Sequence, residues 1–277
     1  MPEVLIAGCG YVGSVAAELF TRAGWRVTGW TRSGGAASAC EIHAVDLSDS
    51  ASVHEASGTF DVVIHCASTK GGKAEHYRRV YFEGARNLRD RFSDSSFIFV
   101  SSTSVYAQTG GVWVTEESAA EPKHETGRIL RETEEFVIQN RGTVARFAGI
   151  YGPGRSVYLQ RLQQGDAVID PENDRFVNQV HRDDAARALL LLANLSAKAE
   201  SQIYNVADDV PLRRNECYRW LAAKLNLPEP RVVVAQPTRK RGDSNKRVAN
   251  KKLRHVGWNP AFPSFHRGME ESVLPAL

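Results

Sequence analysis

A glycine-rich segment near the start of the chain, Gly-Cys-Gly-Tyr-Val-Gly at residues 8–13, constrains the fold more than any other feature. It follows the apolar run 4–7, which predicts a buried strand, and it opens a segment with apolar residues at helical spacing. Such glycines permit a tight turn, close approach of the backbone to a pyrophosphate and close helix–strand packing. A glycine-rich turn without a ligand is the alternative, which this placement disfavours. We therefore expect a dinucleotide at Gly8, Gly10, Tyr11, Val12 and Gly13.

Short β-rich runs alternate with helical patterns as far as residue 147. This alternation predicts a parallel sheet covered by helices on both faces, the doubly wound α/β arrangement of a Rossmann fold. We expect the first strand to be followed by strands at 26–30, 42–45, 61–65, 97–100 and 143–147, with long helices at 74–92 and 126–139.

The sequence changes in character after residue 147. Residues 151–178 are rich in Gly, Pro, Gln and Arg and predict long loops, whereas a helix at 182–195 and a strand at 203–206 return to the main sheet. We therefore expect a dinucleotide-binding domain at 1–150, completed by 179–207. We expect residues 151–178 and 208–277 to form a smaller substrate-binding lobe over the carboxyl ends of the strands, where ligands bind in such folds.

Composition excludes several classes of function. Of the 277 residues, 42% are hydrophobic and 24% are charged, which is typical of a globular protein. The net charge of +3 is too small to indicate nucleic-acid binding, and no apolar run approaches the roughly 18 residues of a membrane span. The four cysteines lie too far apart for a zinc site or a disulfide framework. We expect a cytoplasmic protein that binds no metal, nucleic acid or membrane.

The second predicted strand ends in Trp-Thr-Arg-Ser at residues 30–33. A site for NAD usually has a carboxylate here, which hydrogen-bonds the adenosine ribose. The guanidinium of Arg32 suits a 2′-phosphate instead, and Thr31 and Ser33 add hydroxyl donors. These residues favour NADP over NAD, although NAD stays open because an exposed surface arginine is the alternative explanation.

Several segments, in order, resemble the extended short-chain dehydrogenases/reductases, the NAD-dependent epimerase/dehydratase family. The similar segments are 101–106 (Ser-Ser-Thr-Ser-Val-Tyr), 146–154 (Arg-x4-Tyr-Gly-Pro-Gly), 180–185, 203–206 and 257–260 (Gly-Trp-Asn-Pro). The resemblance implies that the segment with Asp46 and Leu47 contacts adenine, and that Cys66, Ala67 and Ser68 line the cofactor. It also implies a homodimer through helices 74–92 and 126–139. The GxGxxG spacing, in place of the family's GxxGxxG, indicates an atypical subgroup.

The catalytic segment departs from the family pattern of Tyr-x-x-x-Lys. The alignment puts Thr126 in place of the tyrosine and Leu130 in place of the lysine. A threonine hydroxyl can hydrogen-bond a substrate carbonyl but is a poor proton donor. Ser102 matches the family's catalytic Ser/Thr, and Tyr106 is the nearest phenol along the chain. We therefore expect Ser102, Tyr106 and Thr126 to be the catalytic residues.

The resemblance implies an NADP-preferring oxidoreductase, epimerase or dehydratase that acts on a hydroxyl or carbonyl of a small molecule, with a nucleotide sugar as one candidate. The missing Tyr and Lys leave a second hypothesis open, a non-catalytic NADP(H)-binding protein whose partners respond to the redox state of the cofactor. An acid such as Tyr106 near the nicotinamide would favour the enzyme. A site with only Ser102, Thr126 and apolar groups there would favour the binding protein.

Overall fold

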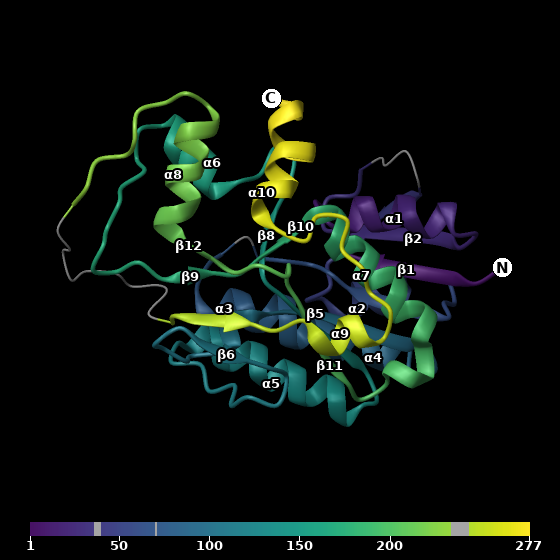
Figure 1. Ribbon diagram of the computed structural model, residues 1–277. Helices are drawn as coiled ribbons and strands as arrows, with labels where there is room; N and C mark the ends of the chain where they lie inside the picture. The colour runs from purple at the N-terminus through teal and green to yellow at the C-terminus, as the bar shows by residue number, and fades with distance from the viewer. Residues whose placement is uncertain (36–39, 70, 234–243) are drawn as a thin grey trace.

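Seven parallel strands form the central sheet, in the order β11-β7-β5-β4-β1-β2-β3 (Figure 1). The computed structural model describes residues 1–35, 40–69, 71–233 and 244–277. The strands are β1 (Glu3–Ala7), β2 (Arg26–Thr31), β3 (Glu41–Ala44), β4 (Val62–His65), β5 (Ser96–Ser102), β7 (Thr143–Phe147) and β11 (Ile203–Val206). Strands β1, β4 and β7 are buried along nearly their whole length, as expected when helices cover both faces. This order confirms the predicted doubly wound α/β fold.

Helices cover the two faces in two groups. Helix α1 (Gly13–Arg22) packs against α7 (Arg182–Leu195) on one face. The other face carries α2 (Ser50–Glu55), α3 (Ala74–Tyr77), the π-helical segment η1 (Arg78–Glu83), α4 (Gly84–Arg91) and α5 (Glu125–Gln139). The helix predicted at 74–92 is therefore three consecutive helical segments, α3, η1 and α4.

A second hydrophobic cluster forms the lobe that lies above one edge of the sheet (Figure 1). It joins α6 (Val157–Gln163), α8 (Arg214–Lys224), α10 (Phe265–Gly268) and η4 (Met269–Val273). Residues 151–178, predicted to be loops, thus contain a helix. The Ser156 side chain caps it by accepting a hydrogen bond from Leu159 N, but its apolar pattern amounts to little more than two buried leucines.

Part of the expected lobe packs on the main domain instead. Strand β13 (Lys246–Val248) pairs with β6 (Val112–Val114), and α9 (Lys251–His255) contacts β11. Leu253 and Trp258 are buried in the larger hydrophobic cluster, where the indole of Trp258 donates a hydrogen bond to Asp184 O at 3.2 Å. The remaining short elements are β8 (Gly149–Tyr151), β9 (Phe176–Val177), β10 (Gln179–His181), β12 (Leu212–Arg213), η2 (Thr103–Val105), η3 (Ser196–Ala199) and η5 (Leu274–Ala276).

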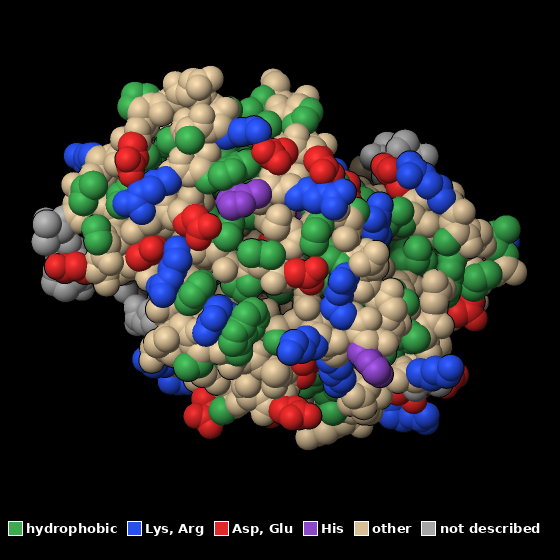
Figure 2. Space-filling view, viewed as in Figure 1, with side chains coloured by type: hydrophobic (Ala, Val, Ile, Leu, Met, Phe, Trp, Pro, Cys, Tyr) green, Lys and Arg blue, Asp and Glu red, His purple; other side chains and the backbone are tan. Residues whose placement is uncertain are grey.

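Within the described part of the chain, no helix has the length and apolar character that a membrane span requires, and no group of His, Cys, Asp and Glu residues could hold a metal ion. Basic and acidic side chains are interspersed over the face shown in Figure 2. The sequence also has a run rich in Lys and Arg at 239–252, which begins outside the described residues.

Candidate functional site

A cleft of about 710 Å³ opens at the carboxyl ends of β1, β2, β4 and β5. It brings together residues that the sequence analysis selected for cofactor binding from four separate segments. These are Gly8, Gly10, Tyr11, Val12, Thr31, Arg32, Ser33, Asp46, Leu47, Cys66, Ala67 and Ser68. Gly13 does not line the cleft. It lies behind the loop, where a Cβ would come within 2.6 Å of Gly8 O.

The glycine loop has the geometry that a pyrophosphate requires. Gly8 has a φ of +105°, and a Cβ there would lie 2.2 Å from Ala67 N, so no other residue fits without displacing backbone. Beside Gly10, the position of a Cβ has no atom within 4 Å, which leaves this stretch of backbone open to a ligand. Trp30 O anchors the loop by accepting hydrogen bonds from Gly8 N and Cys9 N at 2.8 and 3.0 Å. The loop and the start of α1 therefore fit a dinucleotide.

Polar side chains concentrate at the end of the cleft formed by β2 and β3. Asp46 Oδ1 accepts hydrogen bonds from Ser48 N and Ser48 Oγ at 2.9 and 2.8 Å. Partial burial opposes ionisation, but these hydrogen bonds and the nearby Arg79 and Arg32 keep the pKa of Asp46 below its ordinary value. Thr31 Oγ1 donates to Gly34 O at 2.8 Å. Asp46 is therefore a carboxylate that is already hydrogen-bonded within the protein.

The floor of the cleft is aromatic. His65 is fully buried below it, and its Nε2 donates to Val80 O at 3.0 Å. Burial lowers the pKa of His65 to about 4, so the imidazole is neutral. Tyr81 lies against His65 and Phe99, with ring centroids 6.4 and 6.2 Å apart, and its hydroxyl hydrogen-bonds with Ser68. Burial raises the pKa of Tyr81, which keeps this cleft-lining phenol protonated.

The expected catalytic residues separate in space. Ser102 lines the cleft at the end of β5, where its Oγ accepts a hydrogen bond from Ser104 N at 3.1 Å. Thr126, at the start of α5, does not line the cleft, whereas Leu130 one turn later does. The position of the family's lysine thus faces the cleft with an apolar side chain.

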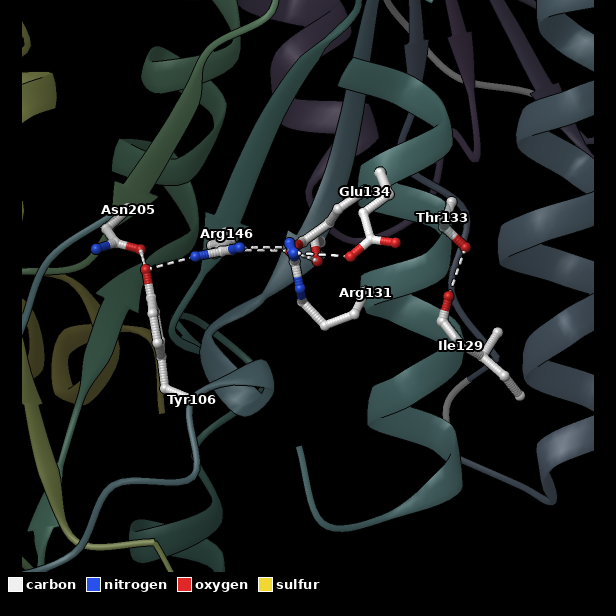
Figure 3. Close-up of polar contacts among 9 residues, drawn as sticks. Tyr106, Ile129, Arg131, Thr133, Glu134, Arg146 and Asn205 are labelled. Carbon is white, nitrogen blue, oxygen red and sulfur yellow. Dashed lines mark hydrogen bonds and ion pairs between the residues drawn. The ribbon is translucent and has the colours of Figure 1, made fainter. Parts of the chain in front are cut away.

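Tyr106 lies in the core, outside the cleft (Figure 3). Its hydroxyl donates to Asn205 Oδ1 at 2.9 Å and accepts from Arg146 Nη1 at 2.7 Å. The turn η2, directly after β5, directs the side chain away from the strand end where Ser102 lies. A phenol that is fully buried and hydrogen-bonded on both sides cannot reach a substrate, so this placement corrects the proton-donor role expected for Tyr106.

A buried ion pair supports the wall of the cleft that α5 forms (Figure 3). Arg146 Nε and Nη2 donate to the two carboxylate oxygens of Glu134 at 2.9 and 2.7 Å. Ser101 Oγ donates to Glu134 at 2.6 Å, and Arg131 also binds this carboxylate. These bonds join α5 to the ends of β5 and β7, so they fix the places of Leu130 and Ser102 in the wall.

The family description "NAD dependent epimerase/dehydratase" matches residues 4–207. The chain belongs to this family. It is also 29% identical over 246 residues to protein YeeZ of Escherichia coli K12, covering 83% of this chain and 86% of YeeZ.

Two solved structures illustrate the similarity of fold. A candidate NAD-dependent epimerase/dehydratase from Methylobacillus flagellatus has 26% sequence identity and a TM-score of 0.78, with 99% of this chain and 98% of that chain covered. UDP-glucose 4-epimerase of Thermus thermophilus, in complex with NAD, has 20% identity and a TM-score of 0.79, with 96% of each chain covered. At that identity the second likeness concerns the fold alone.

The cleft also contains side chains that neither the motifs nor the family resemblance predicted. His76, Tyr77, Arg79 and Tyr81 all line it, and they come from the helical segments that follow β4. For residues 74–92 the family resemblance implies only a dimer interface. The position of this segment in the sequence could have predicted its place in the cleft, because a helix that begins shortly after a central strand starts at the carboxyl edge of the sheet.

The glycine loop is also tied to the segment that leads into the lobe. Tyr11 Oη donates to Pro153 O at 3.0 Å, and the guanidinium groups of Arg155 and Arg182 lie 5.4 and 5.0 Å from its ring centroid. Arg155 lines the cleft as well. The two loops therefore hold each other in place across the cleft.

Proposed function

We propose that this family member binds NADP(H) in preference to NAD(H) and oxidises or reduces a hydroxyl or carbonyl of a small molecule, as an atypical epimerase, dehydratase or reductase. One observation carries the proposal: the glycine loop, Arg32 and Ser102 line a single cleft. When bound there, the nicotinamide cofactor supplies the hydride acceptor or donor. Ser102 Oγ orients the substrate oxygen by a hydrogen bond.

The proton must come from a group other than the expected Tyr106 and Thr126. Three side chains that line the cleft carry an exchangeable proton on a suitable group: His76, Tyr77 and Tyr81. Burial raises the pKa of Tyr81, so this phenol is protonated at neutral pH and is a weaker acid than a free tyrosine. We therefore propose these three residues as the set in which the catalytic acid lies.

Two buried basic side chains outside the cleft lining, Arg214 in α8 of the lobe and Lys246 in β13 of the main domain, support a substrate with an anionic group. Arg214 is buried, its Nε and Nη2 make no hydrogen bond, and the carboxylate of Asp170 is 3.9 Å away. Lys246 is also buried, and its pKa falls to about 8 because of desolvation and the nearby Arg175. A phosphate would pair with such groups. A nucleotide sugar is thus our first candidate substrate.

The proposal is tested in two steps. NADPH and NADH are first titrated into the protein, with cofactor fluorescence as the readout. NADPH oxidation is then followed with nucleotide sugars that carry a keto group. The Ser102→Ala variant should bind NADPH as tightly as the wild type but turn over roughly 10²–10³-fold more slowly, the usual effect of losing one oxyanion hydrogen bond. Equal turnover by Ser102→Ala would contradict the assignment.

A specific observation also favours the non-catalytic alternative. Leu130 contributes no charge to the cleft where the family has its lysine. A non-catalytic protein would bind NADPH and NADP⁺ with different affinities. It would transfer no deuterium from 4-deuterated NADPH to any of the keto-bearing nucleotide sugars. Stereospecific deuterium transfer to one of them would establish the enzyme.

A further inference from the structure

We propose that Arg79 and Arg32 together clamp the 2′-phosphate of the cofactor, so that Arg79 is a second determinant of cofactor choice. The inference rests on the NADP preference in the proposed function and names a residue that the motif at the end of β2 does not contain.

The two arginines reach the same end of the cleft from different elements. Arg32 directly follows β2, and Arg79 belongs to η1, in the helical region after β4. Both line the cleft. Arg79 Nη2 donates to Ser48 Oγ at 3.1 Å, and the same hydroxyl donates to Asp46. This chain of contacts places the guanidinium of Arg79 beside the residues that follow β3.

The charge balance at this end favours a dianion. Asp46 is the only carboxylate among the described residues that line the cleft, and Ser48 already binds its Oδ1 twice. Arg32 and Arg79 both act electrostatically on Asp46, so the two positive charges lie near one negative charge and one positive charge is in excess. A 2′-phosphate supplies the missing negative charge and several acceptor oxygens, whereas the ribose hydroxyl of NAD supplies no charge.

The neighbouring Arg78 shows what an arginine of the same helical segment does when its role is only structural. Arg78 Nη1 and Nη2 donate to the carboxylate of Glu132 at 2.9 and 2.7 Å, away from the cleft. Arg79 has no carboxylate within ion-pair distance in the part of the chain that the structure describes. Two adjacent arginines thus contact different parts of the molecule, Glu132 of α5 and Ser48 after β3, and Arg78 is a matched control for Arg79.

The test compares dissociation constants for NADPH and NADH in wild type, Arg79→Ala, Arg32→Ala, the double variant and Arg78→Ala. We expect Arg79→Ala to weaken NADPH binding about 10- to 100-fold, the usual range for charged hydrogen bonds, and to change NADH binding less than about 2-fold. Arg78→Ala should leave both constants unchanged. Adenosine 2′,5′-bisphosphate should displace NADPH from the wild type more effectively than 5′-AMP, and Arg79→Ala should remove that advantage.

Other outcomes would overturn the inference in identifiable ways. Equal losses for NADPH and NADH in Arg79→Ala would mean that the guanidinium stacks on adenine and does not read the phosphate. An unchanged NADPH/NADH ratio in Arg79→Ala, with a wild type that prefers NADPH, would refute the role of Arg79 alone and leave the proposed function intact. A wild type without NADPH preference would refute both. NADPH preference without turnover on any substrate would refute only the catalytic part of the proposed function.

Discussion

The two walls of the cleft differ in what they offer a ligand. The wall formed by the glycine loop and the ends of β2 and β3 presents backbone N–H groups, Arg32 and hydroxyl groups. The wall formed by α5 and the end of β7 presents Leu130, Phe147 and Ala148. Ser102 at the end of β5 adds a hydroxyl to this side, and its charged side chains lie one layer deeper, where Glu134 and Arg146 are fully buried.

The position of α5 thus depends on buried contacts and not on the side chains that this helix presents to the cleft. The bonds that Glu134 makes with Arg146 and Ser101 position α5 against the sheet, and none of them involves residue 130. The glycine-loop wall and the α5 wall are therefore built by different contacts, and substitutions in one need not disturb the other. Variants of each wall should accordingly have different consequences.

The largest effect is expected behind the α5 wall. Glu134→Ala leaves Arg146 buried without its counter-charge, so we expect the free energy of unfolding to fall by about 3–5 kcal/mol. Glu135→Ala, which removes an exposed ion pair of Arg131 on the same helix, should change it by at most about 0.5 kcal/mol. Urea denaturation measures both. A loss below about 1 kcal/mol for Glu134→Ala would show that the wall does not depend on this ion pair.

A pH-dependent effect is expected at the floor between the walls. Burial lowers the pKa of His65 from 6.5 to about 4, so below pH 6.5 the unfolded chain takes up a proton that the folded chain does not. The contribution of His65 is complete above pH 6.5 and is lost as the pH falls toward 4, by about 3 kcal/mol. Unfolding free energies of wild type and His65→Gln from pH 7 to pH 4.5 should converge as the pH falls. Parallel curves would mean that the pKa of His65 is the same in the folded and the unfolded chain.

A smaller loss of stability, with loss of binding, is expected in the glycine-loop wall. Gly8→Ala places a Cβ against the backbone of Ala67 at positive φ, so we expect about 2 kcal/mol of destabilisation and no measurable NADPH binding. Gly24 also has a positive φ, but a Cβ there meets nothing within 4 Å, so Gly24→Ala should cost about 1 kcal/mol and leave binding intact. Thermal unfolding and the NADPH titration distinguish the two variants. Tight NADPH binding by Gly8→Ala would refute the loop assignment.

The smallest effect is expected outside the cleft. Arg78→Ala removes a half-exposed ion pair with Glu132, which should lower the unfolding free energy by no more than about 1 kcal/mol. The measurement is the same urea titration. A larger loss would indicate that this pair holds α5 against η1 and so contributes to the shape of the α5 wall.

The fold could be predicted from the sequence because buried parallel strands have a continuous apolar pattern. The bounds expected for β7, β11 and α7 coincide with those of the structure. Helix α6 was missed because its pattern is short and lies among polar residues. The position of residues 246–258 on the main domain was missed for another reason: pairing of β13 with β6 joins segments far apart in the chain, which no local pattern reports.

The candidate site was predictable only in part, because local patterns do not report contacts between distant segments. Motifs identified the residues at each strand end, since parallel strands bring their carboxyl ends to one edge. Motifs did not reveal that the turn η2 directs Tyr106 into the core, or that η1 brings Arg79 to Ser48. Both depend on the direction of a side chain after a turn and on contacts between distant segments. The roles of Ser102 and Arg32 stay predictions until they are measured.

The two hydrophobic clusters contain residues from different parts of the sequence, so they are completed at different times during synthesis on the ribosome. The last strand of the central sheet, β11, ends at Val206, so the whole sheet can assemble once that residue has emerged. The lobe's cluster also needs residues 265–273. Until these are made, Tyr151, Leu159 and Leu212 have an incomplete apolar partner surface. The larger cluster in turn lacks Leu253 and Trp258 until they are made, so the lobe's cluster is the last part of the core to be completed during synthesis.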